Sequence, residues 1–210
     1  MSTTSTPYGI VVFSHLRWSF VWQRPQQFLS RFAEKHPVLF VEISEFDLPE
    51  GESPRVDLSK AKEKGQELDN VTVFVAHFPP SYMGSELVTE FLQNGVREAM
   101  ASLNISRPLL WFYNPMDSGW TLGQFNERGV VYDCMDELSQ FKGADPMLVQ
   151  REAELIKAAD VVFTGGYELW TKKSKQHPNT HFFGCAVEYE HFAQAQEDGP
   201  IPEDLAAIPG

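Results

Sequence analysis

Short apolar runs alternate with longer amphipathic stretches along most of the chain. Each run is rich in β-branched or aromatic residues, which is typical of strands covered on both faces. The runs span residues 10–13, 38–41, 71–75, 109–113, 130–132, 161–163 and 181–183. The pattern predicts an α/β fold: a Rossmann-like, doubly wound and mainly parallel sheet of about seven strands with helices on both faces.

The stretches between the runs predict crossover helices. Pro25 suits the first turn of a helix, and Ser85 suits the N-cap of a longer one. Asp145 and Pro146 open a third, and residues 166–176 predict a shorter one. On that last helix, Lys172, Lys173 and Lys175 are expected to form a solvated face, with a contact to anionic lipid as the alternative.

Two segments interrupt this rhythm. Residues 45–69 contain Pro49, Gly51 and Pro54 among mixed charges, so we expect a surface excursion with at most a short helix near Lys60. Residues 193–210 combine prolines with four acids and no base. We therefore expect a Rossmann-like domain over 1–192 and a linker or tail over 193–210.

Composition narrows the function classes. The 210 residues carry 42% hydrophobic and 22% charged side chains, as soluble globular proteins do. A net charge of −12 argues against nucleic acid and against an anionic membrane surface as the main partner, although a weak membrane contact stays open. Two cysteines exclude a disulfide scaffold and a Cys-based zinc cluster. The N-terminus carries no leader pattern, so we expect a cytoplasmic protein, at most peripheral at the inner membrane face.

Polar residues follow several of the predicted strands, where ligands bind in such sheets. They are His15, Asn114, Asp117, Asp133, Asp136, Glu137, Gly165 and Gly166. Three of them are carboxylates within five residues, and crowded like charges raise a pKa toward that of a general base. The alternative for these acids is capping and turn formation.

The loop that follows the first strand is rich in Trp, Arg and Gln. Trp18 and Trp22 suit stacking on a sugar ring or an apolar chain, while Gln23 and Arg24 lie where an anion could meet a helix start. Alternatively, the aromatic rings pack under the loop and Arg24 pairs with an acid. Gly165-Gly166 could admit a phosphate or simply form a tight strand-to-helix turn.

Familiar cofactor and nucleophile motifs are missing from the sequence. It contains no G-x-G-x-x-G after the first strand, no P-loop and no G-x-S-x-G elbow. The histidines show no metal-ligand spacing. We therefore expect no bound cofactor and no metal in this domain, and a complete small-molecule enzyme site is disfavoured.

Several blocks recur in one order along the chain. They are Trp18-x4-Gln23-Arg24-Pro25-Gln26-Gln27, then Tyr132-Asp133-Cys134-Met135-Asp136-Glu137-Leu138, then Asp160-Val161-Val162-Phe163-Thr164, and finally His191-Phe192. From about Gly9 to Phe192 the chain resembles the N-terminal, acceptor-side half of bacterial GT-B glycosyltransferases of the surface-polysaccharide type. It departs from their Asn-Gly-Val-Asp turn at residues 184–188, where it reads Gly-Cys-Ala-Val-Glu.

The resemblance implies a function that this half performs only together with a second domain. GT-B enzymes place the active site between two Rossmann-like domains, and the C-terminal one holds most of the nucleotide sugar. The expected activity is sugar transfer to a glycan or lipid-linked acceptor, and this half alone should be inactive. In inverting members a carboxylate or His of this domain deprotonates the acceptor, which points to Asp136 first and Asp133 second; in retaining members these residues would only orient it.

Other functions compatible with the same residues stay open. The domain could be a non-catalytic carbohydrate- or nucleotide-binding module. Some relatives have been named as, or occur beside, UDP-galactopyranose mutase, but that chemistry needs a flavin, and the flavin fingerprint is missing from this sequence. The sequence indicates no oligomeric state.

Overall fold

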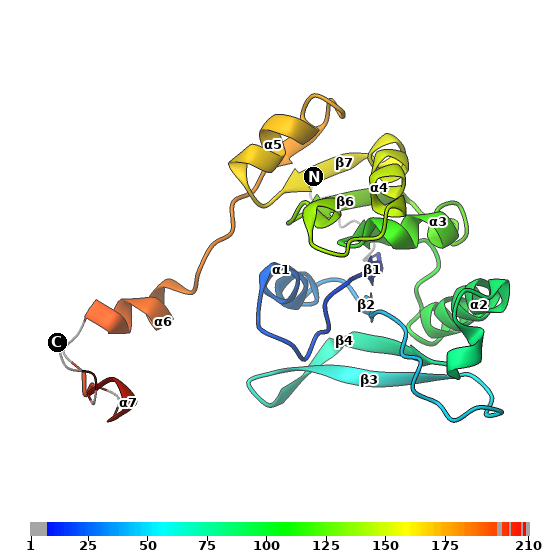
Figure 1. The fold of residues 1–210 in the computed structure, drawn as a ribbon, viewed down its shortest axis with the longest axis horizontal. Coiled ribbons are helices and arrows are strands. Elements are labelled where there is room, and N and C mark those ends of the chain that lie inside the picture. Colours follow the sequence, from blue (N-terminus) through cyan, green and yellow to red (C-terminus); the bar gives the residue numbers. More distant parts are fainter. Residues whose placement is uncertain (1–7, 197–198, 202, 207, 209–210) are drawn as a thin grey trace, which may run out of the picture.

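The computed structural model describes residues 8–196, 199–201, 203–206 and 208. These residues build an eight-stranded sheet in the order β3-β4-β2-β1-β5-β6-β7-β8 (Figure 1). The strands are β1 (Ile10–Phe13), β2 (Val38–Val41), β3 (Arg55–Glu63), β4 (Gln66–His77), β5 (Leu109–Phe112), β6 (Gly129–Cys134), β7 (Val161–Thr164) and β8 (Thr180–Phe182). All neighbours pair in parallel except β3 and β4. The predicted Rossmann-like α/β fold is confirmed, with eight strands instead of about seven.

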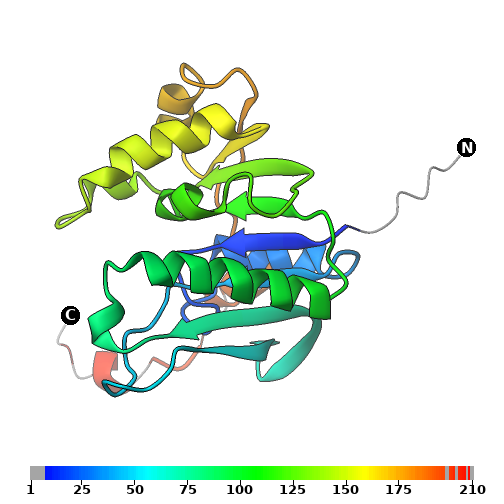
Figure 2. The same ribbon diagram turned by 90° about the vertical axis from the view of Figure 1, so that its right-hand side faces the viewer.

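Helices cover both faces of this sheet. Helix α1 (Arg24–Phe32) packs on one face, where Leu29 belongs to the same hydrophobic core as Ile10 and Val12. The other face carries α2 (Glu86–Ser102), α3 (Ser118–Thr121), α4 (Met147–Ala158) and α5 (Tyr167–Lys173). In Figure 2 the green helix α2 lies in front of the sheet and the blue helix α1 behind it. Alternating side chains of each central strand therefore enter two different hydrophobic cores.

The expected helix starts are present. The Ser85 Oγ accepts a hydrogen bond from the Leu87 backbone N–H at 3.2 Å, and the Asp145 Oδ1 accepts one from Met147 at 2.8 Å. Pro25 lies in the first turn of α1, where its missing N–H costs nothing. Each of these contacts satisfies, or avoids, an amide that a helix start would leave unpaired.

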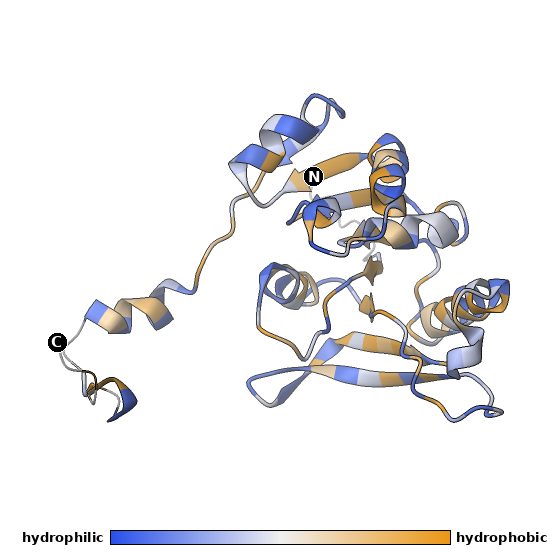
Figure 3. Ribbon diagram, viewed as in Figure 1, coloured by the Kyte–Doolittle hydropathy of each residue, from blue (hydrophilic) through white to orange (hydrophobic). Residues whose placement is uncertain are grey.

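The expectation for residues 45–69 is wrong in one respect. This segment contains β3, an edge strand paired antiparallel with β4, and Lys60 lies in that strand instead of in a helix. Most β3 side chains are exposed, so the segment lacks the apolar run that marks the central strands (Figure 3). Lys64 and Gly65 make the turn with φ values of 50° and 85°. This left-handed pair closes a hairpin that the apolar pattern does not reveal.

The chain leaves the sheet after β8. Helices α6 (Tyr189–Ala193) and α7 (Glu203–Ala206) lie away from the strands and bury none of their residues (Figure 1). Several positions of the predicted linker over 193–210, and the N-terminal residues 1–7 for which no leader was expected, lie outside the described residues.

Candidate functional site

The sheet reverses its strand order between β1 and β5, which is where doubly wound sheets bind ligands. The two strand ends are held together, because the Phe13 carbonyl accepts hydrogen bonds from the backbone N–H groups of Tyr113 at 2.9 Å and Asn114 at 3.3 Å. Residues directly after β1, β5 and β6 therefore gather at this edge. They include His15, Asn114 and Asp136, three of the residues singled out in the sequence.

His15 and Asp136 form the most reactive combination at this edge. The His15 ring is half-buried, and its Nδ1 is shielded from solvent and has no hydrogen-bond partner among the described residues. Burial lowers the pKa of His15, while the Asp136 carboxylate and the Tyr113 backbone act in the opposite direction. A neutral imidazole beside a carboxylate that would stabilise its protonated form can act as a base for a hydroxyl that reaches the exposed part of the ring.

Asp133 is fully buried in an ion pair with Arg24. The Arg24 Nε lies 2.9 and 3.1 Å from the two Asp133 carboxylate oxygens, and Nη2 lies 2.9 Å from Oδ1. Their side chains are 3% and 0% exposed. Burial raises the pKa of Asp133, and the Arg24 guanidinium opposes that shift. A carboxylate so enclosed is not accessible to an acceptor, so the geometry argues against Asp133 as the base and favours the ion-pair alternative for Arg24.

Glu137 belongs to a second ionic cluster. Its Oε1 lies 2.6 Å from the Nζ of Lys173, which also lies 2.7 Å from Glu152 Oε1. The Tyr132 hydroxyl donates to the same Glu152 oxygen at 2.6 Å. Burial raises the pKa of Glu137, but the hydrogen bonds and charge of Lys173 more than offset this and leave the pKa below its usual value. The cluster ties α5 to α4 and to the loop after β6.

The prediction that Lys172, Lys173 and Lys175 form a solvated face is wrong for Lys173. Lys173 is 2% exposed, whereas Lys172 and Lys175 are exposed as expected. The sequence offers no signal that separates Lys173 from its neighbours, because its two glutamate partners come from other elements. Nothing in its spacing marks Glu152 either.

Trp18 is a core side chain. It is 4% exposed and packs edge-to-face on Phe40 and Trp22, with ring centroids 5.2 and 5.8 Å away. Its Nε1 donates to the Lys62 carbonyl at 3.1 Å. Gln23 precedes α1, where its backbone N–H donates to the Gln26 side chain at 3.1 Å. These contacts match the packing alternative for the loop, since stacking on a sugar would require the Trp18 ring to leave the core.

Asn114 and Asp117 form a turn after β5. The Asn114 Oδ1 accepts from the Met116 backbone N–H at 3.2 Å, and its Nδ2 donates to Asp117 Oδ2 at 2.9 Å. The Trp120 Nε1 donates to the other Asp117 oxygen at 3.0 Å. Burial raises the pKa of Asp117 to about 6, although both hydrogen bonds act against that rise. Asp117 therefore titrates close to neutrality at the same edge as His15.

Gly165 and Gly166 form the turn from β7 into α5. A Cβ on Gly165 would lie 3.3 Å from the Met135 Cα and 3.4 Å from the Cys185 Sγ, so glycine allows the loop after β6 to pack closely here. Gly166 is the N-cap of α5, a helix of 7 residues. This geometry supports the tight-turn alternative rather than a phosphate site.

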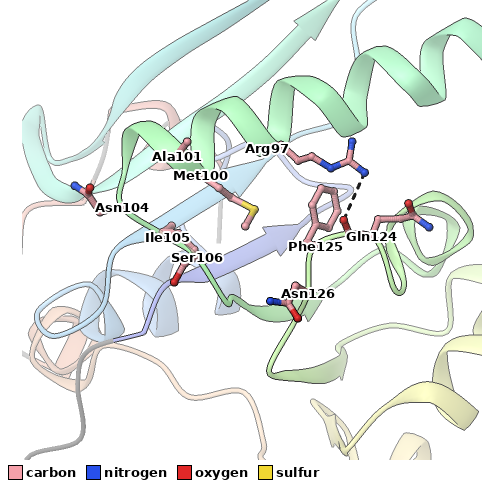
Figure 4. Close-up of a pocket in the computed structure, with 9 residues that line it drawn as sticks. All are labelled: Arg97, Met100, Ala101, Asn104, Ile105, Ser106, Gln124, Phe125 and Asn126. Atoms are coloured by element: carbon pink, nitrogen blue, oxygen red, sulfur yellow. Dashed lines mark hydrogen bonds between the residues drawn. The ribbon is translucent and has the colours of Figure 1, made fainter.

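A cavity of about 540 Å³ opens at the opposite, amino-terminal edge of the sheet (Figure 4). It is lined by Arg97, Met100, Ala101, Asn104, Ile105, Ser106, Gln124, Phe125 and Asn126. None of the residues singled out in the sequence contributes to it. The candidate site thus rests on the strand ends and their side chains, and not on this cavity.

Two features are absent from the described part of the chain. Its helices include none long and apolar enough to span a membrane. Its His, Cys, Asp and Glu side chains form no group of three that could hold a metal ion.

The comparisons with known proteins concern the fold. No protein-family model and no curated protein matches the chain. A solved structure of trehalose-6-phosphate synthase from E. coli, a GT-B glycosyltransferase with UDP-2-fluoro glucose bound, matches with a TM-score of 0.53 and 12% identity. The match covers 94% of this chain and 53% of that one, so the chain spans about half the length of the similar structure. The chain therefore has a GT-B glycosyltransferase-like, Rossmann-type α/β fold.

Proposed function

We propose that the chain is the acceptor-side domain of a glycosyltransferase, which moves a sugar from a nucleotide-sugar donor to a glycan or lipid-linked acceptor. The supporting observation is the match of nearly the whole chain to about half of a GT-B glycosyltransferase. The surface-polysaccharide type is part of this proposal and rests on the sequence blocks around Arg24 and Asp136. Donor binding belongs to a second domain, and this chain alone is expected to be inactive.

His15 and Asp136 carry the chemistry in this proposal. In an inverting reaction, the His15 imidazole takes the proton of the acceptor hydroxyl as the hydroxyl oxygen attacks the anomeric carbon, and the bond between that carbon and the phosphate oxygen of the donor breaks. The Asp136 carboxylate then stabilises the imidazolium. Asn114 and Asp117 lie on the neighbouring turn, where they orient the acceptor. In a retaining reaction the same four residues only orient it.

The edge that carries this site also displays apolar side chains. Phe20 and Val21 follow β1 with 62% and 60% exposure, and Phe141 and Met147 follow β6 with 57% and 40%. Exposed apolar groups beside a polar site favour an acceptor with an apolar chain, which is the lipid-linked option. Because the protein has a net charge of −12, contact with a membrane would come from the apolar chain of the acceptor and not from anionic headgroups.

The test is a transfer assay on the complete gene product with nucleotide sugars as donors and glycan or lipid-linked acceptors. Both His15→Ala and Asp136→Asn should lower the transfer rate by about 10² or more if they move the proton. Asp69→Asn, a change at an exposed position of the β4 hairpin, is the control and should leave the rate unchanged. Rates unaffected by either site variant would remove these residues from the mechanism.

Calorimetry on the 210-residue chain separates the proposal from a binding module. As an acceptor-side domain it should bind nucleotide sugars weakly or not at all. Tight binding of a nucleotide sugar by this chain alone would contradict the proposal and support a non-catalytic carbohydrate- or nucleotide-binding module.

A further inference from the structure

Arg24 joins three parts of the chain that are far apart in sequence. It is the first residue of α1, and its Nε and Nη2 face Asp133 on β6. Its Nη1 donates to the Phe183 backbone carbonyl at 2.5 Å. The centroid of the Phe28 ring lies 4.5 Å from the guanidinium carbon, so the ring covers one face of the group. Each edge of the guanidinium fork therefore serves a different segment.

Phe183 marks the point where the chain leaves the sheet. Its backbone N–H still donates to the Thr164 carbonyl at 3.0 Å, as a continuation of β8. The Arg24 bond to its carbonyl therefore holds the chain at the sheet immediately before the departing segment, residues 184–196. Figure 1 shows this segment leading away from the strands on the side of α1.

The departing segment makes further polar contacts with α1. The Gln27 Nε2 donates to the Glu188 Oε1 at 3.3 Å. A cavity of about 410 Å³ separates Arg31 and Lys64 on the domain from acidic and polar side chains of the segment. Those side chains are Glu188, Glu190, His191 and Gln194. Basic groups on the domain thus face acidic groups on the segment, which favours one direction of departure.

We propose that Arg24 is a positioning residue that sets the direction in which the segment 184–196 leaves the domain, and that Asp133 holds the guanidinium in the orientation this requires. A planar guanidinium with five donors can bind a carboxylate and a carbonyl at once. A lysine ammonium at the same position can neutralise Asp133 but lacks this fork.

The arrangement also links the departing segment to the candidate site. Asp133 lies at the end of β6, three residues before Asp136. The Arg24–Asp133 ion pair therefore contacts β6, the strand that leads into the site loop, and Arg24 also holds Phe183, where the departing segment begins. This inference concerns the chain by itself and holds whether or not the domain transfers sugars.

The test measures the distance between spin labels placed at Lys35, after α1, and at Ala193, in α6, after the exposed Cys185 has been changed to Ser. The unaltered chain should give a narrow distance distribution. Arg24→Lys should broaden it, because the lysine keeps the charge beside Asp133 but loses the carbonyl of Phe183. Arg151→Lys, which changes a half-exposed arginine on α4, is the matched control and should leave the distribution unchanged.

Cleavage by a glutamate-specific protease after Glu188 and Glu190 gives a second readout. We expect cleavage about 10-fold faster in Arg24→Lys than in the unaltered chain, since local opening of the segment exposes the backbone.

Should Arg24→Lys fail to fold, the double variant Arg24→Met with Asp133→Leu replaces the pair by apolar side chains, an exchange that buried ion pairs often tolerate. It should fold and show the same broad distribution. A narrow distribution and unchanged cleavage in either folded variant would overturn the proposal.

Discussion

Asp117 combines a buried carboxylate with two hydrogen bonds, from Asn114 and Trp120. The hydrogen bonds favour its ionised form, but burial disfavours that form more strongly, and the pKa rises from 3.8 to about 6. The folded protein therefore holds this proton more tightly than the unfolded chain does. Ionisation of Asp117 must weaken the fold as the pH rises from about 4 through about 6.

Asp117→Asn should remove the loss of stability that ionisation of Asp117 causes. The amide keeps the size of the carboxylate and an acceptor for Trp120, but its NH2 cannot accept the hydrogen bond from Asn114, so below pH 3.8 the variant should lose about 1 kcal/mol in unfolding free energy. It should also lack the fall of up to about 3 kcal/mol that ionisation of Asp117 causes in the unaltered chain between pH 3.8 and pH 7. Urea unfolding at both pH values measures the difference. The exposed control Asp69→Asn should follow the unaltered chain, and an Asp117→Asn variant with the same pH dependence as that chain would contradict the assigned cause.

The sequence predicts where reactive side chains gather, but it does not predict which of them are held in ion pairs with other side chains. Position after a strand correctly assigns His15, Asn114 and Asp136 to one edge. Whether Asp133 is exposed or buried depends on the alternation of side chains along β6. This strand extends to Cys134, so the Asp133 side chain points toward α1. Its partner Arg24 lies 109 residues away, and no local pattern connects them. Lys173 escapes prediction for the same reason.

Among the elements, the strands covered on both faces are the ones the apolar runs predict well. β1 and β2 coincide with their runs, since a parallel strand between two helical layers needs apolar side chains on both sides. The edge strand β3 has no such requirement. A search for apolar runs misses β3, because most of its side chains are polar and exposed and it is followed by the Lys64–Gly65 turn.

The hairpin turn offers a prediction at this scale. Lys64 has a φ of 50° and Gly65 a φ of 85°, a pair of left-handed residues for which Asn-Gly is preferred. Lys64→Asn should raise the unfolding free energy by about 0.5 kcal/mol, because asparagine adopts positive φ more readily than lysine. Gly65→Ala should lower it by about 1 kcal/mol, since a Cβ is strained at that φ. Chemical denaturation of both variants checks the opposite signs, and equal effects would argue against this turn geometry.

At the scale of the whole molecule, two hydrophobic cores share one sheet. Neighbouring residues of β1 enter different cores, Val11 with α2 and Val12 with α1, so neither core can form without the strands of the other. We expect residues 8–183 to unfold as one cooperative unit. The described residues after Ala193 are all exposed and add little to it.

Shortening the chain tests this division. A chain that ends at Ala193 loses only exposed side chains among the described residues, so its melting temperature should stay within about 2 °C of the full chain. A chain that ends at Phe182 also loses the Phe183 ring, which packs edge-to-face on Phe163 at 5.3 Å, and the Phe183 carbonyl, so that a buried Arg24 donor is left without its acceptor. These losses should lower the melting temperature by roughly 5 °C. Calorimetry on the two chains compares the effects directly, and equal melting temperatures would mean that Phe183 adds nothing to the stability of the fold.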